Sequence, residues 1–168
     1  MDGTRALVVI RHAKSDWSVP EPDRRRPLSP RGRRQAPHVG RWLAGRGLVP
    51  SLALVSPATR ARQTWDLVAG SLAAAGAGVR VEVLESVYTV DGEDLLEVVR
   101  ALPAADRVVA LVSHNPAAED LVTDLTGRPV RLVTSAVAVV ELPSWSSAGR
   151  AVATLRYAGR PADGDRDP

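Results

Sequence analysis

Four short runs of apolar, β-branched residues alternate along the chain with helix-start signals, and this alternation constrains the fold more than any other feature. The runs are residues 5–10, 52–55, 80–84 and 108–112. Each has the composition of a strand that is buried on both faces of a parallel sheet. We therefore predict an α/β three-layer sandwich, with a mostly parallel central sheet that is flanked by helices and joined by right-handed crossovers.

Helix signals follow the first, second and fourth runs, and a further one lies between the third and the fourth. Ser29 and Pro30 supply a cap and a first-turn proline, so we expect a helix from there to about Arg46, kinked or split at Pro37. Three further helices are predicted to begin at Ser56–Pro57, Asp91 and Asn115–Pro116. The helix after Asp91 is short, so we expect no large cap domain.

The chain is expected to end in two strands and a tail. Residues 136–142 and 151–157 are apolar runs joined by a turn, which predicts an antiparallel edge to the sheet. From residue 159 the chain is rich in Gly, Pro and Asp, as is typical of disordered segments. We predict one domain over residues 1–158 and a disordered tail over residues 159–168.

Composition excludes several kinds of chemistry. The chain has no cysteine, so disulfides, thiolate metal ligands and cysteine nucleophiles are absent. It has no phosphate-binding glycine loop, no dinucleotide-binding glycine motif and no paired-histidine zinc motif, and its three histidines are scattered. We therefore expect no cofactor and no metal.

Charge and hydropathy limit the classes of partner that this chain is expected to bind. The net charge of +3 suits phosphate-bearing ligands, and arginines gather at residues 24–26 and 31–34. Aromatic residues make up only 4% of the chain, so a stacking platform for nucleic acid is hard to build, and we expect a solvated arginine loop without a nucleic-acid partner. No apolar run approaches the roughly 20 residues that span a bilayer, and no signal-peptide core is visible. These features favour a cytoplasmic location without a membrane partner.

Histidines and arginines follow three of the predicted strands at the point where each ends. Arg11 and His12 come directly after the first strand. Arg60 lies one turn into the helix after the second strand, and His114 follows the fourth. Ligands of open α/β sheets bind beyond the carboxyl ends of the strands. Two histidines and two arginines gathered there are costly unless an anion joins them, so the sequence predicts an anion site.

Five segments match, in order, the signature elements of a known family. They are Arg11–Ser15, Pro27–Gly32, Ser56–Thr64, Ser113–Pro116 and Val133–Ala136. On these elements the chain resembles the histidine phosphatase superfamily, in particular its short, SixA-type phosphohistidine phosphatase branch. Ala13 stands where the family usually has Gly, and because a Cβ disfavours positive φ, we expect an ordinary backbone conformation there.

The resemblance implies a role for each matched residue. His12 would be the nucleophile that becomes phosphorylated, and Arg11, Arg60 and His114 would hold the phosphoryl oxygens. The two arginines would also lower the pKa of His12 from its reference of about 6.5 and favour the unprotonated ring.

Further residues are assigned by their position relative to these elements. Glu85 takes the place of the carboxylate that protonates the leaving group in many relatives, with a solvent-facing charge as the equal alternative. Ser15, Ser18 and Asn115 complete the set expected to bind phosphate or substrate.

The resemblance implies a metal-independent phosphatase that hydrolyses phosphate monoesters or phosphoramidates through a phosphohistidine enzyme intermediate and releases inorganic phosphate. Without a cap the site should be open, which suits phosphohistidine displayed on a protein. The partner would then be a phosphorylated protein or a small phosphorylated substrate. A small-molecule phosphoester phosphatase of the same superfamily and a non-catalytic phospho-ligand-binding protein are the alternatives, and the oligomeric state is left open.

Overall fold

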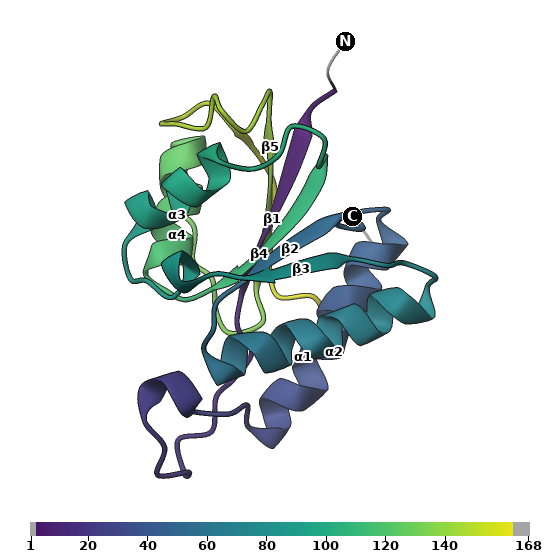
Figure 1. Ribbon diagram of the computed structural model, residues 1–168, viewed down its shortest axis with the longest axis vertical. Helices are drawn as coiled ribbons and strands as arrows, with labels where there is room; N and C mark the ends of the chain where they lie inside the picture. Colours follow the sequence, from purple (N-terminus) through teal and green to yellow (C-terminus); the bar gives the residue numbers. More distant parts are fainter. Residues whose placement is uncertain (1–2, 163–168) are drawn as a thin grey trace.

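The structure is a computed structural model in which residues 3–162 are described. Their sheet has six strands in the order β3-β2-β4-β1-β5-β6 (Figure 1). The strands are β1 (Arg5–Arg11), β2 (Leu52–Val55), β3 (Arg80–Val83), β4 (Val108–Ser113), β5 (Val137–Leu142) and β6 (Thr154–Gly159). The helices are α1 (Pro30–Gly45), α2 (Thr59–Ala74), α3 (Gly92–Arg100) and α4 (Ala117–Thr126), with short 3-10 helices η1 (Asp23–Arg25) and η2 (Glu85–Val87).

Strand β1 lies inside the sheet, and its side chains alternate between two cores. Leu7 and Val9 belong to the core beneath α3 and α4, whereas Val8 and Ile10 belong to the core beneath α1 and α2. All four side chains are fully buried. Helices thus cover both faces of the sheet (Figure 1), and the predicted three-layer α/β sandwich is confirmed. Within residues 3–162, no helix is long and apolar enough to cross a membrane.

The direction of the strands determines where their loops meet. Strands β1 to β4 are parallel, and β5 runs antiparallel to both β1 and β6. The predicted mostly parallel sheet with an antiparallel edge is therefore confirmed. Because the four parallel strands end at the same side of the sheet, the segments that follow β1, β2 and β4 converge there. Only η2 and α3 separate β3 from β4, so no large cap covers this side.

Three details of the helices and strands differ from the prediction. Helix α2 begins at Thr59, three residues after the predicted start at Ser56. Helix α1 continues through Pro37 and is not split there, although Pro37 cannot donate a backbone hydrogen bond. Strand β6 begins later than predicted and includes Gly159, the first residue of the predicted tail. Residues 163–168 of that tail lie outside the described residues.

Strand β3 is the element for which the predicted burial was wrong. We expected a strand buried on both faces, but all its residues are exposed, including Val81 at 46% and Val83 at 49%. The reason is position, because β3 is an edge strand that pairs only with β2. An apolar run in the sequence does not say whether its strand is central or at the edge.

Candidate active site

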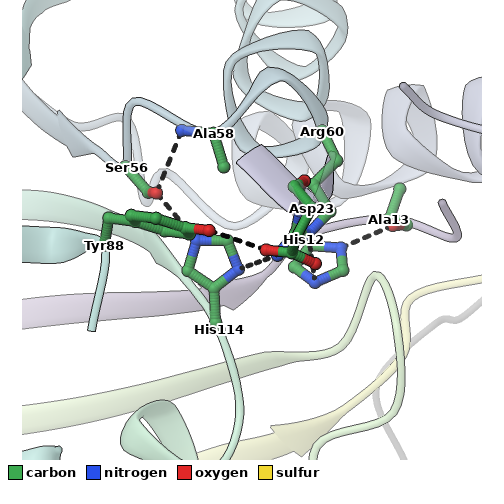
Figure 2. A network of polar contacts seen from close by, with 8 residues as sticks. All are labelled: His12, Ala13, Asp23, Ser56, Ala58, Arg60, Tyr88 and His114. Atoms are coloured by element: carbon green, nitrogen blue, oxygen red, sulfur yellow. Dashed lines mark hydrogen bonds and ion pairs between the residues drawn. The ribbon is translucent and has the colours of Figure 1, made fainter. Parts of the chain in front are cut away.

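Three side chains from distant segments meet at the carboxyl side of the sheet (Figure 2). His12 directly follows β1, Arg60 lies in the first turn of α2, and His114 directly follows β4. Nε of Arg60 lies 3.3 Å from Nε2 of His12, and Nη2 of Arg60 lies 3.3 Å from Nδ1 of His114. The two imidazole rings are 5.1 Å apart between centroids. The structure thus brings these three predicted site residues into contact.

Thr64 ties helix α2 to the segment that follows β1. Its hydroxyl accepts a hydrogen bond from the backbone N–H of Ala13 at 2.9 Å and donates one to the carbonyl of Arg60 at 2.7 Å. Thr64 is fully buried one turn after Arg60, so this link holds Arg60 beside His12. Ala13 is not among the described residues with positive φ, so its predicted ordinary backbone conformation is confirmed.

Hydrogen-bond partners decide which nitrogen of each histidine carries the proton. Nδ1 of His12 lies 2.7 Å from the carbonyl of Ala13, which can only accept, so Nδ1 holds the proton and Nε2 has a lone pair. Arg60 donates to Nδ1 of His114, which places the proton of that ring on Nε2, 2.7 Å from the hydroxyl of Ser56. Nε2 of His12 therefore faces Arg60 as an unprotonated nitrogen.

Burial is the main reason that both histidines are neutral. His12 is 7% exposed, and its burial lowers its pKa to about 3, against the opposing hydrogen bond to Ala13. The positive charges of Arg60 and Arg11, and of His114 when it is protonated, contribute to this lowered pKa in the same direction. Burial, followed by Arg60, lowers the pKa of His114 to about 4. The predicted direction for His12 is thus confirmed, but burial outweighs the arginines.

Arg11 and Asn115 lie next to this cluster and share an anchor. Nη1 of Arg11 donates to the carbonyl of Leu132 at 2.9 Å, and Nδ2 of Asn115 donates to the same carbonyl at 2.8 Å. Nε of Arg11 is buried without a hydrogen-bond partner among the described residues. Arg11 therefore brings positive charge and an unused donor to the histidines.

Asp23 is a site residue that sequence reasoning missed. Its backbone carbonyl accepts from Nη1 of Arg60 at 2.6 Å, and its Oδ2 accepts from Nη2 of Arg60 at 3.0 Å (Figure 2). Asp23 immediately precedes the run Arg24–Arg26, for which the sequence predicts a solvated loop. The available signal was a single acid beside three arginines, since such an acid commonly pairs with a cation.

Tyr88 is the second residue that sequence reasoning missed. Its hydroxyl donates to Oδ2 of Asp23 at 2.7 Å, and its ring stands edge-on to His114 with centroids 5.4 Å apart. The hydrogen bond from Tyr88, followed by that from Arg60, lowers the pKa of Asp23. The same bond raises the pKa of Tyr88. No motif in the sequence points to Tyr88, because only the turn at η2 brings it to the site.

A pocket of about 540 Å³ opens over these groups. It is lined by Asp23, Arg60, Tyr88, Thr89, Val90, His114 and Asn115. His12 is not among these lining residues but contacts one of them, Arg60. Within residues 3–162, no group of three histidine, aspartate or glutamate side chains is placed to hold a metal ion. The donors gathered at the pocket suit an anion.

Three predicted site residues are not brought into this cluster. Glu85 is exposed, and Nη1 of Arg24 donates to its Oε2 at 2.9 Å, a pairing that lowers the pKa of Glu85. Ser18 is also exposed and bonds to Asp16. Ser15 is buried, and its backbone pairs with the segment before α1. The acid role of Glu85 stays a prediction that this position does not favour.

Comparison with known proteins defines the class. The model of the histidine phosphatase superfamily (branch 1) matches residues 7–88. An uncharacterized protein of Mycobacterium tuberculosis strain H37Rv is 31% identical over 154 residues, which cover 92% of this chain and 90% of that protein. The chain belongs to the histidine phosphatase superfamily.

Solved structures narrow the class to one branch. A structure described as the protein histidine phosphatase SixA complexed with tungstate is 27% identical and superposes with a TM-score of 0.81, covering 94% of this chain and 98% of that chain. A candidate phosphohistidine phosphatase SixA from Agrobacterium tumefaciens is 26% identical, with a TM-score of 0.79 and the same coverage. These matches support the SixA-like branch that the motifs predict, and membership of the superfamily supports a phosphatase.

Proposed function

We propose that this protein hydrolyses phosphohistidine in proteins, with His12 as the nucleophile and residues 1–158 as the catalytic domain. The observation that carries the proposal is the buried, unprotonated Nε2 of His12, which lies in contact with Arg60 and beside His114. A neutral imidazole nitrogen next to fixed cationic donors suits attack on a phosphoryl group. The SixA structures support phosphohistidine as the substrate class.

In the first step, Nε2 of His12 attacks phosphorus while the bond from phosphorus to the leaving nitrogen breaks. Arg60 donates to both histidine lone pairs in the free protein, and these donors turn to the phosphoryl oxygens when substrate binds. A planar guanidinium can bind two such oxygens at once. The arriving negative charge favours protonation of Nδ1 of His114, which then donates to a third oxygen.

In the second step, water attacks the phosphorus of phospho-His12. The bond from phosphorus to Nε2 breaks, inorganic phosphate leaves and His12 regains its lone pair. The buried, unpartnered Nε of Arg11 provides a further donor for the charge that spreads over the phosphoryl oxygens. No other covalent group is needed.

The acids near the site favour a leaving group that needs no carboxylic acid. Asp23 and Glu85 both have lowered pKa values, through Tyr88 and Arg60 in one case and through Arg24 in the other, so both are carboxylates at neutral pH. An alkoxide needs a proton as it leaves, whereas the imidazole of phosphohistidine is readily protonated by solvent. The ionised state of these two carboxylates therefore supports phosphoramidates rather than alkyl phosphates as substrates.

Access to the pocket supports a protein substrate. Val90 and the side chain of Asp23 are exposed at the pocket, and only η2 and α3 lie between β3 and β4. A phosphoryl group on a protein surface can approach such a site without the opening of a lid.

The test is rapid quench with a phosphohistidine protein that carries a labelled phosphoryl group. We expect an acid-labile, base-stable phosphoenzyme in the wild type and in His38→Ala, a control at a half-buried histidine of α1, and none in His12→Ala. Label retained by His12→Ala would overturn the nucleophile. Alkyl phosphates turned over as fast as phosphohistidine would favour the small-molecule alternative, and binding of phosphoprotein without turnover would favour the non-catalytic one.

A further inference from the structure

The free edge of β3 is a surface to which the site assigns no role. β3 forms one edge of the sheet (Figure 1), and Val81 and Val83 are among the most exposed large apolar side chains of the described residues. Exposed apolar edge strands can pair with other chains unless short length, charged side chains, proline or a bulge blunts them. β3 is four residues long, has no proline and pairs with β2 without a bulge, and its two charges, on Arg80 and Glu82, are of opposite sign, so its edge is open to a partner of complementary charge.

The backbone of β3 has donors and acceptors that face away from β2. The N–H of Arg80 donates to Ser51 at 3.0 Å, and the N–H of Leu84 donates to Val55 at 3.1 Å. Successive residues of a strand direct their backbone groups to opposite sides. Those of Val81 therefore point to the free edge, as do those of the residues two before and two after it.

We propose that a second copy of this chain pairs with β3, antiparallel, about a two-fold axis at Val81. Antiparallel pairing sets outward-facing residues opposite one another, so the axis can pass through any residue from Val79 to Val83, and an axis at Arg80 or Glu82 would set like charges opposite each other. Only the axis at Val81 sets Arg80 of one copy opposite Glu82 of the other, and symmetry repeats this pair. The edge is thus complementary to itself in charge.

The same register pairs the apolar side chains. Val81 lies opposite Val81 of the second copy, and Val83 lies opposite Val79. Val81 and Val83 share the α2 face of the sheet, because their register partners are Ala53 and Val55. Pairing therefore covers the apolar side chains of β3 that α2 leaves exposed. Removal of this apolar surface from water, the hydrophobic effect, favours association.

Charge on the opposite face favours the same partner. Arg80 and Glu82 are register partners of Leu52 and Leu54, and a groove of about 660 Å³ opens on this face between β3 and α3. Its lining includes the carboxylates Glu82, Asp94 and Glu97.

Arg80 is half-exposed and already has two acidic neighbours in its own chain. Its Nη2 donates to Asp106 at 2.8 Å, and its Nε lies 3.7 Å from Oε1 of Glu82, so among the described residues only Nη1 has no acidic partner. Arg80 of the second copy would therefore bring its guanidinium to an acidic rim.

The arrangement leaves both candidate sites accessible. In an antiparallel pair the carboxyl ends of the two β3 strands point in opposite directions, so the two pockets face opposite ends of the dimer. Dimer formation and phosphatase activity are therefore separable, and failure of one proposal leaves the other standing.

Sedimentation velocity tests the dimer over a roughly hundredfold range of concentration. We expect a monomer–dimer equilibrium for the wild type and for Arg156→Glu, a control on the opposite edge strand. Glu82→Arg should weaken the dimer by about tenfold, because symmetry replaces an attractive pair by a repulsive one twice. A wild type that stays monomeric throughout, or a Glu82→Arg dimer as tight as the wild type, would overturn the proposal.

The absence of cysteine allows a direct test of the register. Hydrogen-bonded antiparallel pairs place Cα atoms about 5.5 Å apart, within the range that a disulfide spans. Val81→Cys should therefore cross-link to itself on oxidation, roughly tenfold faster than Val152→Cys, a control at another exposed valine. Equal rates on a non-reducing gel would show that the two-fold axis does not lie at Val81.

Discussion

Two arginine–carboxylate pairs involve the adjacent residues Asp23 and Arg24 and differ in what else they contact. Arg60 meets Asp23 at 3.0 Å, and Arg24 meets Glu85 with a hydrogen bond of 2.9 Å. The side chain of Arg60 is 9% exposed and contacts both histidines, whereas that of Arg24 is 46% exposed and contacts neither in any hydrogen bond described. The two pairs thus have similar distances but different surroundings: only the Arg60 pair has one buried partner, and an exposed ion pair such as Arg24–Glu85 contributes little to stability.

The largest expected effect comes from the buried arginine. Arg60→Lys keeps the charge but cannot make two parallel hydrogen bonds to a phosphoryl group. We expect kcat with phosphohistidine protein to fall by at least about tenfold, equal to roughly 1.4 kcal/mol of transition-state stabilisation. Arg24→Lys is the matched control and should leave kcat unchanged. Equal kcat values for the two variants would remove the distinction between the pairs.

A smaller effect is expected at Asp23, the carboxylate that pairs with Arg60. Asp23 occupies donors of Arg60 that phosphate needs, and its charge repels an arriving anion. Asp23→Asn should therefore bind inorganic phosphate about threefold more tightly by calorimetry. Glu85→Gln, the same change in the exposed pair, should bind phosphate as the wild type does. Weaker binding by Asp23→Asn would mean that Asp23 positions Arg60 more than it competes with phosphate.

The exposed carboxylate should matter least for turnover. Glu85→Gln breaks a pair that solvent already screens, so we expect kcat with phosphohistidine to change by less than about twofold. The same variant should also be measured with an alkyl phosphate as substrate. If Glu85→Gln lowers kcat by about 10²–10⁴-fold for the alkyl phosphate alone, Glu85 acts as a general acid for that substrate.

The smallest effect concerns titration of the histidines. Because burial lowers the pKa values to about 3 for His12 and about 4 for His114, the neutral rings persist as the pH falls toward those values. Their NMR ring signals should therefore stay constant from pH 8 to about 5. Arg24→Gln should leave the same signals constant, since Arg24 is not among the causes of either shift. A midpoint near pH 6.5 in the wild type would show that the site is open to water.

Strand β3 shows where sequence patterns stop being informative about the fold. The run of residues 80–84 looks like the buried runs of β1 and β4, and its position as a strand was predictable. Its exposure was not, because burial depends on which strands pair beside it. The cap of α3 is different. The side chain of Asp91 accepts a hydrogen bond from the backbone N–H of Glu93, and this local cap was predictable from the residue type.

The sequence by itself determined the α/β alternation, the strand ends that bear His12 and His114, and the place of Arg60 near the start of the helix that follows the second strand. These follow from periodicity and capping, which act over a few residues. Only the tertiary structure decided that Asp23 pairs with Arg60 and bonds to Tyr88, that Glu85 pairs with Arg24, and that burial outweighs charge at His12. The physical reason is that side-chain partners and desolvation depend on how segments far apart in sequence pack, and no local pattern encodes that packing.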